Sequence, residues 1–108
     1  MKRRNELLID LYNCKENFSK KKIKEYINGV CKVIKMKKHG KMRVWRDKRK
    51  GFEGFSAFQF IKTSSIVLHN FDKDCYIDIF SCKKFDYDKA LRFTKNFFKA
   101  EEIVVRKI

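Results

Sequence analysis

Three strand-like runs at residues 55–62, 64–70 and 75–82 constrain the fold of this chain more than any other feature. In the last run Tyr76, Asp78 and Phe80 alternate with Ile77 and Ile79, which is the period of a half-buried strand. A polar turn near residues 72–74 separates the second run from the third. The pattern therefore predicts consecutive antiparallel strands, and the side chains suited to chemistry lie on them: Ser64, Ser65, His69 and Cys82.

The flanking segments predict two helices and further strands. Residues 5–14 alternate as a first strand, and Ser19 offers an N-cap for a helix that Gly29 is expected to end. Residues 31–38 and 41–46 are expected to form two strands around a turn at 39–40, and residues 47–54 a loop. Asp86 is expected to cap a second helix, and residues 102–107 to form a last strand. We expect one domain, residues 1–108, of α+β class with two helices packed on one face of an antiparallel sheet. The uncovered sheet face favours a homodimer or homotrimer.

The chain is strongly basic, with a formal net charge of +15. Such a surface attracts anions such as nucleic acid, phosphate-bearing small molecules or anionic lipid, although a Lys-rich composition can also arise without any function. No apolar run reaches the length of a membrane span, and no signal peptide is evident. The four cysteines form no CxxC pair, so we expect reduced thiols, no metal site and a cytoplasmic location.

Taken alone, the candidate site residues have two interpretations. His69 and Cys82 fall on adjacent predicted strands, where a histidine can act as a base beside a serine or a cysteine. Ser64 precedes His69 by five residues, and this odd offset places the two side chains on opposite faces unless a bulge intervenes. The same residues also suit structural roles, as a polar strand end, a small buried thiol and a turn-bonding serine.

The spacing of these residues resembles that of the small prokaryotic S-adenosylmethionine decarboxylases. That family carries a serine, a histidine five residues later and a cysteine at the end of the next strand, and here these are Ser64, His69 and Cys82. Ser56 matches a further serine of the family, and Phe71 matches an aromatic position. The segments ELLIDLYNC and DYDKALRFTKNFFKAEEIVVRKI resemble the first strand and the final helix and strand, whereas residues 37–54 are much less similar. The resemblance implies the family fold, with βαβ units of ferredoxin-like type.

The resemblance also implies roles for these side chains. In the family the serine is the site of self-cleavage and becomes a pyruvoyl group, which condenses with the substrate amine and acts as an electron sink. The histidine assists this processing, and the cysteine reprotonates the product. Carried over, the roles would fall on Ser64, His69 and Cys82, with Ser56 supporting the processing step.

Two departures favour a different reaction as our main hypothesis. Thr63 replaces the glutamate that the family places before the cleaved serine, and the +15 charge suits a substrate that bears phosphate. We therefore predict a carbon–sulfur lyase without a cofactor, acting on S-adenosylmethionine or on the SAM-AMP second messenger of type III CRISPR systems. The substrate carboxylate would displace the sulfonium and give methylthioadenosine-type product and homoserine lactone.

Two alternatives remain open. One is a pyruvoyl-dependent S-adenosylmethionine decarboxylase of polyamine biosynthesis, and the other is a non-catalytic ligand- or nucleic-acid-binding module that uses aromatic residues between basic ones. The substrate-binding candidates are Ser56, Thr63, Ser65, Phe71, Glu53 and Asp78. The candidates for a phosphate are Arg43, Arg46, Lys48, Arg49 and Lys62.

Overall fold

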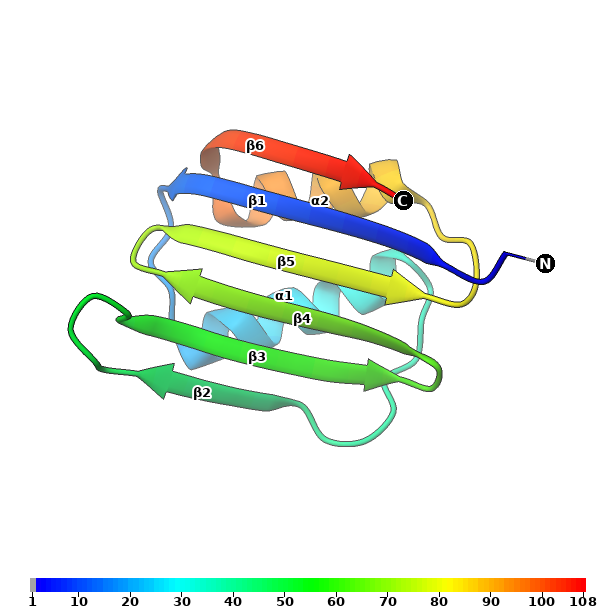
Figure 1. Cartoon of the computed structure of the whole chain (residues 1–108), viewed down its shortest axis with the longest axis horizontal. Helices are drawn as coiled ribbons and strands as arrows, with labels where there is room; N and C mark the ends of the chain where they lie inside the picture. Colours follow the sequence, from blue (N-terminus) through cyan, green and yellow to red (C-terminus); the bar gives the residue numbers. More distant parts are fainter. Residues whose placement is uncertain (1) are drawn as a thin grey trace.

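A computed structural model describes residues 2–108 as one six-stranded antiparallel sheet with two helices on a single face, as Figure 1 shows. This confirms the predicted α+β class. The strands are β1 (Asn5–Cys14), β2 (Arg43–Asp47), β3 (Gly54–Ile61), β4 (Ser64–Phe71), β5 (Asp74–Ser81) and β6 (Ala100–Lys107). The helices are α1 (Lys20–Val33) and α2 (Tyr87–Phe98).

The strands lie in the order β2-β3-β4-β5-β1-β6, so the three strands of the central stretch are neighbours in space (Figure 1). Short turns join β3 to β4 and β4 to β5, because Ile61 pairs with Ser64 and Phe71 pairs with Asp74. Alternation then assigns each residue to a face of the sheet. The inner face, which includes Ile66, is buried under the helices, and the outer face carries no other element (Figure 1).

Both helices begin at the predicted caps. The Ser19 side chain accepts a hydrogen bond from the Lys22 backbone N–H, and the Asp86 carboxylate accepts one from Lys89. The helices pack on each other through Tyr26, which is fully buried and hydrogen-bonds Thr94 at 2.7 Å. These contacts hold α1 and α2 across the inner face. No helix among residues 2–108 is long and apolar enough to cross a membrane.

The strand predicted for residues 31–38 is wrong, because α1 continues to Val33 and an irregular segment follows it. Gly29 does not end the helix. A Cβ atom at this position would lie 2.3 Å from Cζ of Phe93, so a larger residue would displace the Phe93 ring of α2. Burial of Val30 and Cys31 then carries the helix onward, since tertiary packing outweighs the local signal of a glycine.

Candidate active site at the β3–β4 turn

Ser64 is the first residue of β4 and directly follows a two-residue turn. The turn consists of Lys62 and Thr63, and Lys62 has a φ of +47°, in the left-handed region that residues other than glycine rarely adopt. The Ser64 side chain points to the inner face and is only 7% exposed. The peptide bond before Ser64 therefore sits in a tight turn, with the serine hydroxyl held inside the protein.

A short chain of hydrogen bonds connects this turn to the end of β5. The Ser64 hydroxyl donates to Oγ of Ser81 at 3.3 Å and accepts from the Cys82 backbone N–H at 3.3 Å. Ser81 also accepts from the Lys83 backbone N–H at 3.0 Å, and the Thr63 hydroxyl lies 2.6 Å from Sγ of Cys82. Thr63, Ser64 and Cys82 are thus brought together as the sequence suggested. Ser81 was missed, although its position in the alternation with Ile77 and Ile79 places it on the same face.

A pocket of about 350 Å³ opens beside these residues. No acidic residue among residues 2–108 lines this pocket. Beside the hydrogen-bonded residues, it is lined by four lysines: Lys35, Lys37, Lys62 and Lys83. The hydrogen bond to Thr63 lowers the pKa of the Cys82 thiol, assisted by Ser64 and by the charge of Lys83. The other three thiols are buried, and burial raises the pKa of Cys14 and of Cys31 to about 11. Cys82 therefore combines the exposure and the lowered pKa that are typical of a reactive cysteine.

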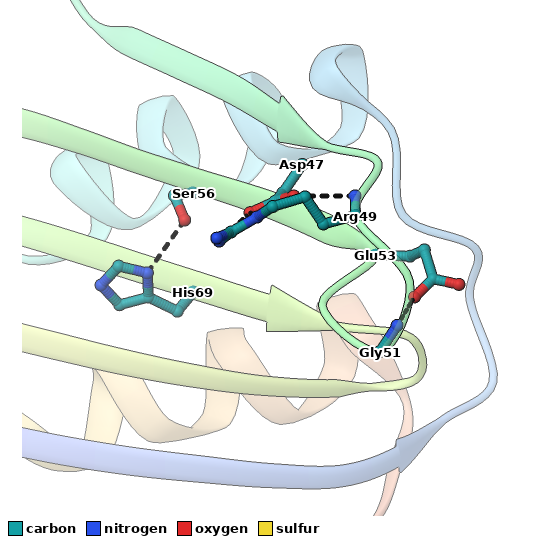
Figure 2. A network of polar contacts seen from close by, with 6 residues as sticks. All are labelled: Asp47, Arg49, Gly51, Glu53, Ser56 and His69. Carbon is teal, nitrogen blue, oxygen red and sulfur yellow. Dashed lines mark hydrogen bonds and ion pairs between the residues drawn. The ribbon is translucent and has the colours of Figure 1, made fainter.

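His69 does not share this pocket. It lies on the outer face, because five residues along a regular strand reverse the side-chain direction and no bulge intervenes. Its Nδ1 hydrogen-bonds Oγ of Ser56 at 3.0 Å across the paired strands, as Figure 2 shows. The structure thus joins Ser56 with His69, and Ser64 with Cys82, on opposite faces of the sheet.

Three further candidates lie on the outer face with His69. Ser65 is half-buried, and the Phe71 ring packs 6.1 Å from that of Tyr76. Asp78 shares a hollow of about 540 Å³ with His69. The Glu6 carboxyl is 8% exposed and lies near Asp78 on the neighbouring strand. Burial is the main cause that raises the pKa of Asp78 to about 6, and the neighbouring Glu6 carboxyl adds to it.

We expect Asp78→Asn to stabilise the protein at pH 7 and to change little at pH 4. A raised carboxyl pKa contributes stability below the unfolded pKa, and this contribution is lost as the pH rises through about 6. The amide removes the ionisation, and solvent screening of this partly exposed group limits the gain to about 1 kcal/mol. Urea unfolding of both proteins from pH 4 to pH 8 measures this. An equal difference at both ends of the range would contradict the assignment.

The basic residues expected to bind a phosphate do not gather at Ser64, apart from Lys62. Arg46 and Lys48 line a separate cleft of about 570 Å³ that also contains Glu53. This cleft lies at the opposite end of β3, about 25 Å away for a strand of eight residues. Arg49 forms an ion pair with Asp47 at 2.7 Å (Figure 2), and Arg43 is exposed on β2. The predicted phosphate site is therefore not part of the serine pocket.

The aromatic residues that a nucleic-acid-binding module would use are also divided. Trp45 and Phe58 pack together on the outer face at 5.7 Å, whereas Phe55 lies on the inner face and Phe52 in the loop. No group of three or more His, Cys, Asp and Glu residues within 2–108 could hold a metal ion.

Comparison with known proteins agrees with the fold. The profile of the S-adenosylmethionine decarboxylase family matches residues 5–108. Two relatives from Clostridium botulinum, of strains Langeland and Hall, are each called S-adenosylmethionine decarboxylase proenzyme. Each is 34% identical over 102 residues, covering 90% of this chain and 86% of the relative. The crystal structure of the adenosylmethionine decarboxylase from Aquifex aeolicus superposes with a TM-score of 0.79 at 16% identity, covering 97% of this chain and 88% of that one.

The fold places the chain in a class of small α+β proteins with the fold of the Aquifex decarboxylase. This chain belongs to the S-adenosylmethionine decarboxylase family.

The prediction of a cofactor-free carbon–sulfur lyase is wrong. The family and the relatives at 34% identity are decarboxylases, and the relatives are named as proenzymes. The SAM-AMP substrate, the link to CRISPR and the methylthioadenosine product therefore have no support. The structure also weakens the reasoning behind them. The basic loop lies far from Ser64. The hydroxyl of Thr63 contacts Sγ of Cys82.

Proposed function

We propose that this chain is a pyruvoyl-dependent S-adenosylmethionine decarboxylase that cleaves its own backbone between Thr63 and Ser64. The observation that carries the proposal is the placement of Ser64 directly after a tight turn, with its hydroxyl held by the Cys82 backbone N–H at 3.3 Å. This contact fixes the side chain of the residue that follows the peptide bond that must break. The proenzyme relatives at 34% identity support the same reading.

The residues around Ser64 fit a pyruvoyl group. This group carries two adjacent carbonyl oxygens, which require hydrogen-bond donors when they are buried. The Cys82 backbone N–H and the Ser81 hydroxyl each lie 3.3 Å from Oγ of Ser64, so two potential donors lie beside residue 64. When present, the group supplies an electron sink for the charge that develops on the substrate as carbon dioxide leaves.

Cys82 is proposed to return a proton from Sγ to the product. Its side chain lines the same pocket as Ser64, and it is the one cysteine of the chain that is not buried. The lysines lining the pocket add the positive charge that attracts a substrate carboxylate.

The role of His69 in processing stays a prediction. Within one chain β4 separates the imidazole from Ser64, and five residues span about 16 Å along the strand. Its contact with Ser56 fixes the imidazole on the outer face, where Asp78 offers a carboxylate to the amine or sulfonium of a substrate.

The oligomeric state and the cytoplasmic location also stay predictions. The outer face exposes Trp45, Phe60 and Phe71, which are 53%, 54% and 40% exposed, and such a face suits a homodimer or homotrimer better than water.

Mass spectrometry of the purified protein tests the proposal. We expect the 13.1 kDa chain to be replaced by two fragments that separate before Ser64, the second without a free amino terminus. The cleaved protein is expected to release carbon dioxide from carboxyl-labelled S-adenosylmethionine. A chain that stays intact and releases none would overturn the proposal.

A further inference from the structure

Four lysines line the pocket that also contains Thr63 and Ser64, the residues between which the proposed function cleaves the chain. Lys62 precedes Thr63 in the turn and Lys83 follows Cys82, while Lys35 and Lys37 reach the pocket from the segment after α1. Within residues 2–108 none of the four lies within ion-pair distance of a carboxylate, although other lysines such as Lys99 do. This concentration of positive charge has no partner in the uncut chain.

Self-cleavage creates a carboxylate at this place. The Ser64 hydroxyl displaces the Ser64 nitrogen from the Thr63 carbonyl carbon, so this C–N bond breaks as an ester C–O bond forms. The Cβ–O bond of Ser64 then breaks and leaves its oxygen in the Thr63 carboxylate. One water replaces the nitrogen on Cα of residue 64, and the nitrogen leaves as ammonia. Residue 64 needs no external oxidant, because its Cα is oxidised to a ketone while its Cβ is reduced to a methyl group. Thr63 then carries a new negative charge inside the lysine-lined pocket.

We propose that Lys35, Lys37, Lys62 and Lys83 bind the carboxylate that self-cleavage creates on Thr63 and hold it beside Cys82. This inference rests on the proposed function, since an uncut chain has no such carboxylate. Exposed ion pairs are individually weak, but several cations around one anion act together. The lysines thus keep Thr63, the new chain end after β3, in the active site.

The bound carboxylate also changes the setting of Cys82. The groups that face its thiol are Thr63, Ser64 and Lys83, with the other three lysines lining the same pocket. In the uncut chain the thiol pKa is lowered by Thr63 and by the charge of Lys83. A carboxylate beside the thiol opposes this shift, so cleavage moves Cys82 toward the protonated form that can give up a proton.

Carbonyl labelling gives a direct test, because the chain contains only two threonines, Thr63 and Thr94. In protein grown with carbonyl-13C threonine, only the Thr63 signal becomes a carboxylate on cleavage. We expect its titration midpoint to lie below the range of about 3.3–3.7 for a free chain end. K83A and K37A should raise the midpoint toward that range, whereas K24A, which alters an exposed lysine on α1, should not.

Alkylation of Cys82 by iodoacetamide provides a second measurement at neutral pH. The cleaved protein and uncut Ser64→Ala both lack the serine hydroxyl, so they differ in the cut and in the pyruvoyl group that stands in place of alanine at residue 64. We expect alkylation about threefold to fivefold slower in the cleaved protein, as for a neighbouring charge worth one exposed ion pair. The inference would be overturned by two results together. The titration midpoint of Thr63 would lie in the range of a free chain end and stay unchanged in the lysine variants, and the alkylation rates of the two proteins would be equal. A wild-type chain that is never cut would instead overturn the proposed function.

Discussion

Ser64→Ala is expected to leave the chain in one piece and to abolish decarboxylation. Alanine has no hydroxyl to attack the neighbouring peptide bond and cannot become a pyruvoyl group. The remaining side chains offer no other electron sink, so the loss should reach at least about 10⁶-fold, near the lower end of enzymatic rate accelerations. Intact mass and carbon dioxide release measure the two effects on the same sample.

Ser65→Ala is the matched control for this variant. Ser65 follows directly in β4 but points to the outer face, away from Cys82 and Ser81. We expect Ser65→Ala to be cut and to remain active. Ser64→Ala also leaves the Cys82 N–H without its acceptor, which costs about 1–3 kcal/mol, so thermal unfolding should accompany the assay. A cut or active Ser64→Ala protein would remove Ser64 from the mechanism.

Much of the fold could be predicted because local signals and global packing agree. The strict alternation from Ser64 to Ser81 matches β4 and β5, and Ser19 and Asp86 cap the helices as expected. The failure at residues 31–38 has the opposite cause. Gly29 is a helix-stop signal in isolation, but the Phe93 ring of α2 occupies the space that a side chain would take there, and the burial of Val30 and Cys31 carries the helix onward.

The site was predicted in parts but not as a whole. The odd spacing of Ser64 and His69 correctly separated them onto two faces, and the pairing of β4 with β5 brought Cys82 to Ser64. Ser81 and the lysines of the segment after α1 were missed, because their roles depend on long-range register and on where that segment crosses the sheet end.

The main functional hypothesis was wrong because it gave too much weight to Thr63. The absence of the family glutamate before Ser64 predicts the loss of self-cleavage only if that side chain is what positions the serine. The structure shows instead that the hydroxyl of Ser64 is held by a backbone N–H, which does not depend on the side chain at position 63. The net charge was equally misleading, since the basic loop lies at the other end of the sheet from the serine.

Cys82→Ala is expected to separate cleavage from turnover. The contact that holds the Ser64 hydroxyl comes from the backbone of residue 82, and it survives the loss of the thiol. We therefore expect the variant to be cut as completely as the wild type. Turnover should fall by about 10²–10⁴-fold, the usual contribution of a positioned proton donor. Fragment masses and carbon dioxide release again measure the two steps.

Cys82→Ser refines this test, because a serine hydroxyl keeps the size and the contact with Thr63 but gives up its proton much less readily than a thiol. Activity in Cys82→Ser should therefore resemble that of Cys82→Ala, and this similarity would assign the defect to proton transfer. Full activity in Cys82→Ser would mean that the side chain only orients Thr63. An uncut Cys82→Ala chain would mean that the thiol takes part in backbone cleavage. Since Cys14, Cys31 and Cys75 are buried, none of them can replace the missing thiol, and the outcome reports on position 82 alone.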